Sequence, residues 1–371
     1  DASVADAAGA PSGARPRVGV CLVTHNDADD LPDCFAAVRA LRHRPLDVVV
    51  ADCASGDDSV ARARAFAAAM AGAEDVRVIV RPLGRNRGFA GGMNAAFAAT
   101  DAPFLLTLNA DAHPAPDYLD RLLRHAVDAD ARVGAVTGRL TRPPDSGGAR
   151  RLDACGMFLI RSWRHLDRGS GEVDRGQYAT PARVFGGTGA ATLWVRRALD
   201  DVAFPPALVD PDDRDAPAVF DPDFHTFRED AELAFRLQAR GWDAIYEPSA
   251  RAVHRRSNLP GRRQRMPAFI NRHTLKNRYL LRAYHQTARN ALATLAPTLV
   301  RDALALGYVL LCERTSLGAY AWLWRHRARL RARRRWLMAR KTHALAPWFA
   351  RDQQPLCRAL PRAAAIEPPA D

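Results

Sequence analysis

Lysine, paired cysteines and long apolar runs are scarce in this sequence of 371 residues. Lys276 and Lys341 are its only lysines, so arginine carries almost all of the positive charge. Together with the abundant alanine, this indicates a GC-rich genome more than a particular chemistry. The 6 cysteines form no CxxC pair and show no metal-like spacing, which argues against a zinc module and fits the reduced thiols of a cytosolic protein.

A membrane-spanning segment is not expected, because no run of about 18 uncharged apolar residues occurs. The best candidate, residues 291–312, contains Pro297, Arg301 and Asp302, which we expect to interrupt it. The first residues lack the charged, apolar and small-residue parts of a signal peptide. The sequence therefore predicts a cytoplasmic protein.

Charge is distributed very unevenly. The apolar content of 48% and charged content of 26% are ordinary for a globular protein and exclude wholesale disorder. The net charge is −7 over residues 1–250 but +21 over residues 251–351, where Asp302 and Glu313 are the only acidic residues. The positive charge is therefore concentrated in the C-terminal third.

Apolar runs of strand length alternate with amphipathic segments through the first half of the chain, which predicts an α/β fold with a mostly parallel central sheet flanked by helices. The expected strands are residues 17–23, 47–51, 76–80, 104–108 and 133–137, and the expected helices are 31–42, 57–71, 92–99, 116–128 and 230–240.

This pattern predicts three regions. Residues 1–16 are rich in Ala, Gly and Pro and are expected to be mobile. Residues 17–265 form an α/β domain with a first part over 17–138 and a second part over 139–265. Residues 266–371 form a basic helical extension.

Polar residues follow the first two expected strands, with Thr24 and Asn26 after one and Asp52 and Ser55 after the other. Parallel strands end in a shared crevice, where a carboxylate can accept hydrogen bonds from a uracil or thymine ring. The alternative is that Asp52 and Ser55 cap the helix expected near residue 57.

The segment GRNRGFAGGMNAAF, residues 84–97, has the glycines that allow a backbone to approach a ligand closely. The following helix N-terminus suits an anion. It matches neither a Walker loop nor a GxGxxG after the first strand, which weakens ATP and NAD as ligands. The alternative is a tight turn without a ligand.

The segment Asn109-Ala110-Asp111 follows the strand at residues 104–108. Asp111 could bind Mg²⁺ or Mn²⁺ that bridges a diphosphate. The alternative is that it caps the helix expected near Pro114.

Glu229 and Asp230 stand together at a helix start, flanked by Phe224 and Phe227. An apolar setting can hold a carboxylate partly desolvated and poised as a base, whereas N-capping is the structural alternative. His254 ends the short strand that follows, and the intervening helix and strand could return it to the same region. A lone histidine is otherwise more often structural.

Two further stretches are rich in glycine or acid. The segment DRGSGEVDRGQY, residues 167–178, followed by VFGGTG, residues 184–189, is interpreted as a ligand-facing loop, with a solvated linker as the alternative. Residues 205–222 form an acidic, proline-rich loop.

The order of these motifs is more specific than any one of them. Thr-x-Asn, Asp-x-x-Ser, NxGFAGGxN, LNxDA, VFGGxGA and the Glu-Asp, GW and P-x-A-x-x-H elements follow one another between Arg17 and Tyr284. This succession resembles family 2 inverting glycosyltransferases of GT-A fold, in the bacterial branch that includes rhamnosyltransferases. The segment at residues 167–178 resembles a signature of that branch.

The resemblance implies that residues 17–265 are the catalytic domain, with a nucleotide-sugar half over 17–138 and an acceptor half over 139–265. It also implies a role for each matching residue. It makes Asp230 the catalytic base, with Glu229 as its neighbour. It also implies a divalent metal cofactor, Mg²⁺ or Mn²⁺. Nucleotide-sugar binding is implied for Thr24, Asn26, Asp52, Ser55, Asn86, Gly88, Asn94, Asn109 and Asp111, acceptor-side placement for Gly187, Thr188 and Trp242, and metal binding for Asp111 and His254.

Three departures from the family pattern matter. Asn109 replaces the first carboxylate of the usual DxD, which predicts a loosely held metal that arrives with the donor. The aromatic-rich segment before the catalytic pair reads FHTFREDAEL, which alters the acceptor side. The acidic loop at residues 205–217 is longer than usual.

The resulting hypothesis is a metal-assisted, inverting transfer of a rhamnose-like sugar from a dTDP- or UDP-sugar to a hydroxyl of a cell-envelope glycan or polyprenyl-lipid-linked acceptor. A non-catalytic sugar-nucleotide binder is one alternative. A basic nucleic-acid-binding protein is another, disfavoured because the charge lies outside any recognisable nucleic-acid module.

The arginine-rich segment RHRARLRARRR, residues 325–335, alternates with Leu and Trp. Such a helix can lie on anionic lipid, which predicts a protein peripheral on the inner face of the cytoplasmic membrane. The alternative is that the segment packs on the catalytic domain.

Overall fold

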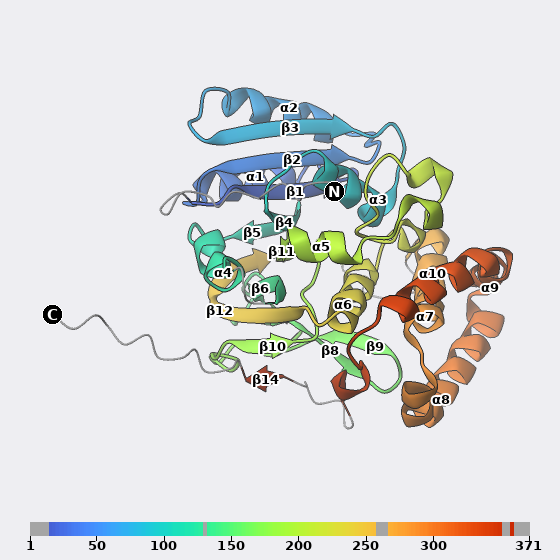
Figure 1. Cartoon of the computed structure of the whole chain (residues 1–371). Helices are drawn as coiled ribbons and strands as arrows, with labels where there is room; N and C mark the ends of the chain where they lie inside the picture. Colours follow the sequence, from blue (N-terminus) through green and yellow to red (C-terminus); the bar gives the residue numbers. More distant parts are fainter. Residues whose placement is uncertain (1–14, 129–131, 257–265, 351–356, 360–371) are drawn as a thin grey trace, which may run out of the picture.

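The computed structural model describes residues 15–128, 132–256, 266–350 and 357–359. Within these residues an eleven-stranded sheet is accompanied by a small three-stranded sheet and by helices (Figure 1). The expected mobile N-terminus, residues 1–16, lies almost wholly outside the described residues. The strands are β1 Val18–Thr24, β2 Leu46–Asp52, β3 Val76–Pro82, β4 Phe104–Asn109, β5 Ala112–Pro114, β6 Val133–Thr141, β7 Leu152–Ala154, β8 Met157–Ile160, β9 Arg164–Asp167, β10 Ala182–Val184, β11 Ala191–Val195, β12 Asp243–His254, β13 Phe349–Ala350 and β14 Arg358–Ala359. The helices are α1 Leu31–Ala40, α2 Ser59–Ala69, α3 Gly88–Ala98, α4 Tyr118–Ala126, α5 Arg196–Val202, α6 Glu229–Ala239, α7 Ala268–His285, α8 Ala288–Cys312, α9 Gly318–Arg325 and α10 Arg327–Arg340.

The first half of the chain forms a parallel block in the order β3-β2-β1-β4. β1 and β2 are almost wholly buried, as expected for near-continuous apolar runs in a parallel sheet. Helices α1 and α2 pack together through stacked Phe35 and Phe66 rings, whose centroids are 4.3 Å apart. The predicted mostly parallel α/β fold is confirmed, and its strands end at a common edge.

The second half adds antiparallel strands that the sequence pattern did not predict, and β11 is the one at the centre of the sheet. β11 lies between β4 and β6 and runs antiparallel to both, while β12 runs parallel to β6. Its apolar run ATLWV resembles that of a parallel strand, so the pattern gives no direction. Because β11 runs backwards, the segment just before it, residues 187–190, meets the carboxyl end of β4.

The part of the chain between β6 and β11 carries the short strands β7, β8, β9 and β10. The glycine-rich segment at residues 167–178 is held by its own part of the chain. Gly171 donates its N–H to the Leu152 carbonyl at 2.9 Å, and the Tyr178 hydroxyl donates to Glu172 at 3.0 Å. This segment therefore does not depend on a ligand for its order.

Helices α7 to α10 gather on one side of the sheet (Figure 1). Leu280, Leu281 and Tyr284 of α7 and Leu330 and Leu337 of α10 share a buried apolar cluster with α6. These helices are therefore packed on the catalytic domain.

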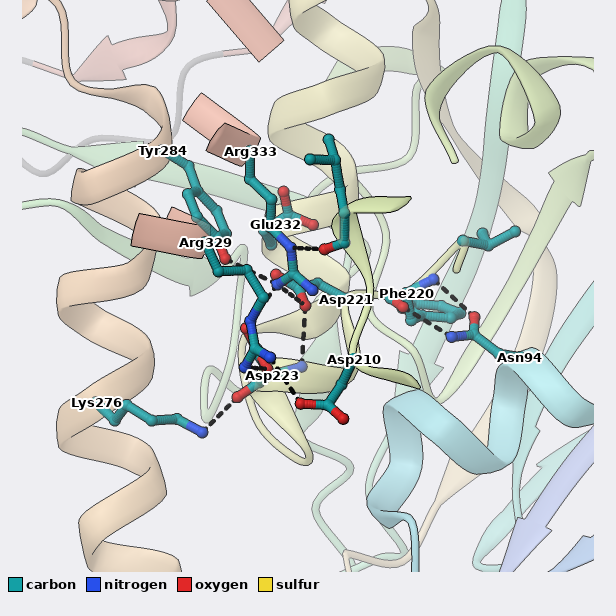
Figure 2. A network of polar contacts seen from close by, with 12 residues as sticks. Asn94, Asp210, Phe220, Asp221, Asp223, Glu232, Lys276, Tyr284, Arg329 and Arg333 are labelled. Carbon is teal, nitrogen blue, oxygen red and sulfur yellow. Dashed lines mark hydrogen bonds and ion pairs between the residues drawn. The ribbon is translucent and has the colours of Figure 1, made fainter. Parts of the chain in front are cut away.

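The arginines of α10 meet the acidic segment of residues 205–223 (Figure 2). The Arg333 side chain is fully buried and lies 2.6 Å from Asp221 and 2.7 Å from Asp223. Arg329 contacts Asp210 at 2.7 Å and Asp223 at 2.8 Å. The expectation that residues 325–335 lie on lipid is therefore wrong for Arg329 and Arg333, because carboxylates of residues 205–223 bind both side chains.

Helix α8 runs without a break through Pro297, which corrects the expectation that its apolar run is interrupted. It is 25 residues long, with a mean hydropathy of 1.5 over its most apolar window, and only 11% of that window is buried. Among the described residues it is the one helix with the length and composition of a membrane-crossing segment.

Candidate active site

Thr24 and Asp52 lie side by side because β1 and β2 pair in a register that sets one opposite the other. Just beyond them, the Asn26 N–H donates to the Ser55 hydroxyl at 3.0 Å, and the Ser55 N–H donates to an Asp52 carboxylate oxygen at 3.1 Å. The other Asp52 oxygen is buried and has no hydrogen-bond partner among the described residues. The structure thus brings these four predicted residues together and leaves one acceptor available for a ligand.

The capping alternative for Asp52 and Ser55 does not hold. Helix α2 begins at Ser59, and the carboxylate that accepts the Ser59 N–H, at 3.0 Å, belongs to Asp57. Asp52 is therefore free of the structural role that competed with ligand binding.

The loop at residues 84–88 packs against the segment that precedes α6. Asn86 accepts the Gly88 N–H at 2.8 Å, and Gly88 has φ +65°. A Cβ at Gly88 would lie 2.4 Å from the His225 carbonyl oxygen, so only glycine fits there. The predicted close backbone approach is thus made to another loop of the same site.

Asn94 is buried and serves that loop packing. Its amide donates to the Phe220 carbonyl at 2.8 Å and accepts the Phe220 N–H at 2.8 Å (Figure 2). Because both ends of the amide are engaged, Asn94 acts on the site by fixing α3 to residue 220.

His254 and Asp111 meet because β5 pairs antiparallel with the end of β12, which sets His254 opposite Ala112. The His254 Nε2 atom lies 3.2 Å from an Asp111 oxygen, and its Nδ1 atom lies 2.8 Å from Asp153. Burial lowers the pKa of His254, but the hydrogen bonds to Asp111 and Asp153 outweigh it and raise the pKa to about 9. Helix α4 begins at Tyr118 with Asp117 as its N-cap, so Asp111 is not the helix cap that was its alternative.

The Asp111–His254 pair fits a divalent metal that takes its remaining ligands from a substrate. In the described part of the chain, no cluster of three or more His, Cys, Asp or Glu side chains could hold a metal. The pair supplies one carboxylate and one imidazole, a donor set that Mn²⁺ tolerates better than Mg²⁺. Asp153 on Nδ1 would fix the tautomer that leaves Nε2 free to bind a metal.

The carboxylates of Glu229 and Asp230 have different surroundings. Asp230 accepts the Gly189 N–H at 3.0 Å and the Ala231 N–H at 2.7 Å. Glu229 is buried, and one of its oxygens has no partner among the described residues. Burial raises the pKa of both, and the neighbouring Asp230 charge raises that of Glu229 further, whereas the two backbone N–H groups oppose the rise at Asp230. Asp230 is therefore the residue of the pair whose negative charge is better stabilised.

The segment before the pair is strained and held by α7. His225, Phe227 and Arg228 all have positive φ, at 62°, 65° and 74°. The buried Asn277 side chain places its amide nitrogen 2.7 to 2.8 Å from the carbonyl oxygens of residues 224, 226 and 227. Left-handed backbone costs about 1 kcal/mol or more per bulky residue, so this helix sustains the conformation that aims Asp230.

The segment of residues 187–190 joins the two carboxylate sites. Gly189 donates to Asp230, and the next residue, Ala190, accepts the Asn109 N–H at 2.9 Å. A Cβ at Gly187 would lie 2.4 Å from the Thr192 hydroxyl, and Thr188 uses its carbonyl to accept that hydroxyl at 2.7 Å. Gly187 and Thr188 directly precede Gly189, the residue that donates to Asp230, and their acceptor-side role stays a prediction.

Trp242 does not belong to this site. It stands just before β12, at the opposite end from His254, and its indole N–H donates to Asp201 at 2.9 Å. Arg132 and Arg197 stack on its ring at 4.4 and 5.7 Å. The predicted acceptor-side role is wrong for Trp242, because it packs at the end of β12 that lies opposite His254.

Three side chains of the site were missed from the sequence. Asp153 supports His254, Asn277 supports the strained segment, and Arg228 directly precedes the acidic pair. Asp153 and Asn277 stand far in sequence from the residues they hold, in segments without a motif. Arg228 could have been noticed as the cation next to the Glu-Asp pair.

Comparison with known proteins places this site in a family. Residues 19–188 match Glycosyl transferase family 2, and residues 104–350, more than half of the chain, match Glycosyl transferase family group 2. An N-acetylglucosaminyl-diphospho-decaprenol L-rhamnosyltransferase of Mycobacterium tuberculosis is 28% identical over 266 residues, which cover 66% of this chain and 77% of that protein.

Two solved structures share the fold. One is the mannosyltransferase PcManGT from Pyrobaculum calidifontis in complex with GDP-Man and Mn²⁺, with a TM-score of 0.50, 20% identity and coverage of 84% of this chain and 76% of that one. The other is GalNAc-T7 with UDP, GalNAc and Mn²⁺, with a TM-score of 0.52, 13% identity and coverage of 74% and 48%. The chain belongs to glycosyl transferase family 2 and is a glycosyltransferase of GT-A fold.

Proposed function

We propose that this glycosyltransferase moves a rhamnose-like sugar, with inversion, from a dTDP- or UDP-sugar to a hydroxyl of a polyprenyl-diphosphate-linked glycan. The observation that carries the proposal is the Asp230 carboxylate, held by two backbone N–H groups beside the segment of residues 187–190. The named activity of the mycobacterial relative supports the sugar and the lipid-linked acceptor. The proposed location is the inner face of the cytoplasmic membrane.

The donor would lie along the carboxyl ends of β1, β2 and β4. The free oxygen of Asp52 suits the ring N–H of a uracil or thymine base, with Thr24, Asn26 and Ser55 around it. Asn86 and Gly88 would form the wall of the donor pocket opposite the base. Asn109 and Asp111 would face the diphosphate of the donor.

Asp111 and His254 would hold the divalent metal, and Asp153 would orient the imidazole. When bound, the metal neutralises charge on the departing nucleoside diphosphate. Two protein ligands are few for Mn²⁺ or Mg²⁺, which supports a metal that arrives with the donor.

The reaction would be a single displacement. Asp230 takes the proton of the acceptor hydroxyl, whose oxygen forms a bond to the anomeric carbon. The bond from that carbon to the diphosphate oxygen breaks on the opposite face, so the nucleoside diphosphate leaves and the configuration inverts. Burial, and then the neighbouring Asp230 charge, raises the pKa of Glu229, which disfavours a second negative charge beside the base.

The Asp230→Asn variant tests this role, with Asp117→Asn at the start of α4 as a control that removes a helix-start carboxylate elsewhere. Asp230→Asn should lower the transfer rate by about 10²–10⁴. Thermal stabilisation by the donor with Mn²⁺ should persist in both variants, and a screen of nucleotide sugars by the same method identifies the donor. Near-full transfer by Asp230→Asn with donor binding intact would exclude Asp230 as the base.

The alternatives lose support from the structure. Arg329 and Arg333 are engaged by carboxylates, which removes the main basis for a nucleic-acid-binding surface. A non-catalytic sugar-nucleotide binder would have no need for the paired Glu229 and Asp230, and turnover of the donor distinguishes it.

A further inference from the structure

A cavity of about 370 Å³ lies between α7 and α8, next to the acidic pair. Arg228, Arg278 and Arg301 line it together with apolar residues of α8 that include Leu304 and Val309. Its volume falls in the range of about 300–1,000 Å³ that is usual for small-molecule sites. We refer to it as the arginine cavity.

The arginine cavity holds more positive charge than its surroundings balance. The guanidinium groups of Arg228 and Arg301 make no hydrogen bond or ion pair with any described residue, and neither does that of neighbouring Arg164. Asp302 is bound by Arg278 at 2.5 Å and is shared with Arg282. Burial, followed by repulsion among these arginines, lowers the pKa of Arg228 and of Arg301 to about 10. The carboxylates of Asp230 and Asp302 oppose this shift only in part. A group of half-buried arginines with so few carboxylates beside it favours the binding of an anion.

The arginine cavity opens toward the apolar face of α8. Leu304 lines the cavity and is also 70% exposed. Other exposed apolar side chains lie along the same side of the helix and, with Leu304, give one continuous face: Leu292, Leu295, Leu299, Val300, Leu306, Leu310 and Leu311.

The opposite face of α8 is attached to the protein. The Trp163 indole donates to Thr294 at 3.0 Å, and Asp302 binds the arginines of α7. A helix fixed along one side and apolar along the other suits the interface of a lipid bilayer. A ligand that presents an anion to the arginines and a hydrocarbon to α8 fits both features.

We infer that the arginine cavity binds the diphosphate of a lipid-linked acceptor, whose polyprenyl chain leaves along the apolar face of α8. The inference rests on the proposed function, because it assigns a site to the proposed acceptor. Arg228 directly precedes Glu229 and Asp230, so the diphosphate would sit next to the catalytic base.

The test compares Arg301→Gln with Arg289→Gln, a matched variant that removes an exposed arginine near the start of the same helix. Full-length proteins are sedimented with phosphatidylcholine vesicles that contain polyprenyl diphosphate, phosphatidylglycerol or neither. Wild-type protein and Arg289→Gln should bind the polyprenyl diphosphate vesicles best. Arg301→Gln should lose that preference by about tenfold or more, because it removes a hydrogen bond to a charged group.

Three outcomes would overturn the inference. One is equal binding of Arg301→Gln and wild type to polyprenyl diphosphate vesicles. A second is an equal loss in Arg289→Gln, which would indicate general electrostatic attraction. The third is complete and equal competition by inorganic pyrophosphate and by a short-chain polyprenyl diphosphate, which would indicate a free-phosphate site without a lipid contribution. Unchanged unfolding temperatures exclude misfolding as the cause.

Enzyme kinetics separate this inference from the proposed function. Arg301→Gln should raise KM for the lipid-linked acceptor while it leaves donor binding unchanged. If no variant or wild type transfers sugar from any donor, yet Arg301 still governs binding to polyprenyl diphosphate, the proposed function fails and the cavity assignment stands.

Discussion

Residue by residue, the acidic pair shows how two adjacent carboxyl groups receive different chemistry. Backbone N–H groups stabilise the charge of Asp230, whereas Glu229 faces a buried environment in which one oxygen has no partner among the described residues. A carboxyl that stays protonated can sit beside a base without repelling it. This difference has a measurable consequence for stability.

Substitution Glu229→Gln should stabilise the fold more at high pH than at low pH. The folded-state pKa of Glu229 is raised well above 4.5, mainly by burial. Its contribution to stability is therefore fully present below about pH 4.5 and is lost as the pH rises through the folded pKa, while glutamine has no such dependence. Unfolding temperatures of variant and wild type at about pH 5 and pH 8 check this, and the gain should reach a few degrees at the higher pH. A difference that does not change with pH would contradict the assignment.

Metal binding should depend on the nucleotide, because we propose just two protein ligands, Asp111 and His254, in the part of the chain that the structure describes. Isothermal titration of donor-free protein with MnCl₂ should detect weak binding, and addition of the nucleoside diphosphate should tighten it. Substitution Asn109→Asp adds a second carboxylate and should strengthen metal binding without nucleotide by about tenfold. Tight Mn²⁺ binding by the wild type alone would contradict a metal that arrives with the donor.

Among the elements, the acidic segment of residues 205–223 joins two distant parts of the chain. Its carboxylates bind Arg329 and Arg333 of α10, while Asp213 and Asp215 bind Arg85 and Arg87 of the loop at residues 84–88. This segment therefore has a structural role, as the link between that loop and the C-terminal helices.

Removal of the central cation should destabilise this link strongly. Substitution Arg333→Ala leaves the buried Asp221 without its cation and leaves Asp223 with Arg329 alone, which should cost about 3–5 kcal/mol in the free energy of unfolding. Arg331→Ala, on the exposed face of the same helix, is the control. Urea denaturation measures both, and a loss below about 1 kcal/mol for Arg333→Ala would mean that the network contributes little.

The elements also reveal what the sequence could predict. The five strands expected in the first 141 residues form, because near-continuous apolar runs bounded by polar turns have few other buried solutions. β11 was missed because its direction depends on a connection without a helix. His254 and Asp111 meet through β5, only three residues long, and no periodicity reports such pairing. Long-range support from Asp153 and Asn277 likewise leaves no local pattern.

For the molecule as a whole, the exposed face of α8 predicts membrane association. Substitution Leu299→Glu, at a side chain 57% exposed, should not disturb the fold but should lower partition onto phosphatidylcholine–phosphatidylglycerol vesicles by about tenfold or more, since burial of a leucine contributes about 1.5–3 kcal/mol. Val127→Glu, a 51% exposed apolar position after α4 on the far side of the sheet (Figure 1), is the control. Equal partition of the two variants would show that α8 does not face lipid.

Arg228 and Glu229 are adjacent in the chain, and this adjacency has a consequence for the structure of the product. If the diphosphate is held at Arg228, the backbone fixes the reach from the lipid attachment point to the base. The enzyme would then modify the sugar at one set distance from the lipid and would not modify sugars farther along the glycan. Such an enzyme would add its sugar once, near the lipid end of a growing polymer, and other enzymes would determine the length of the polymer.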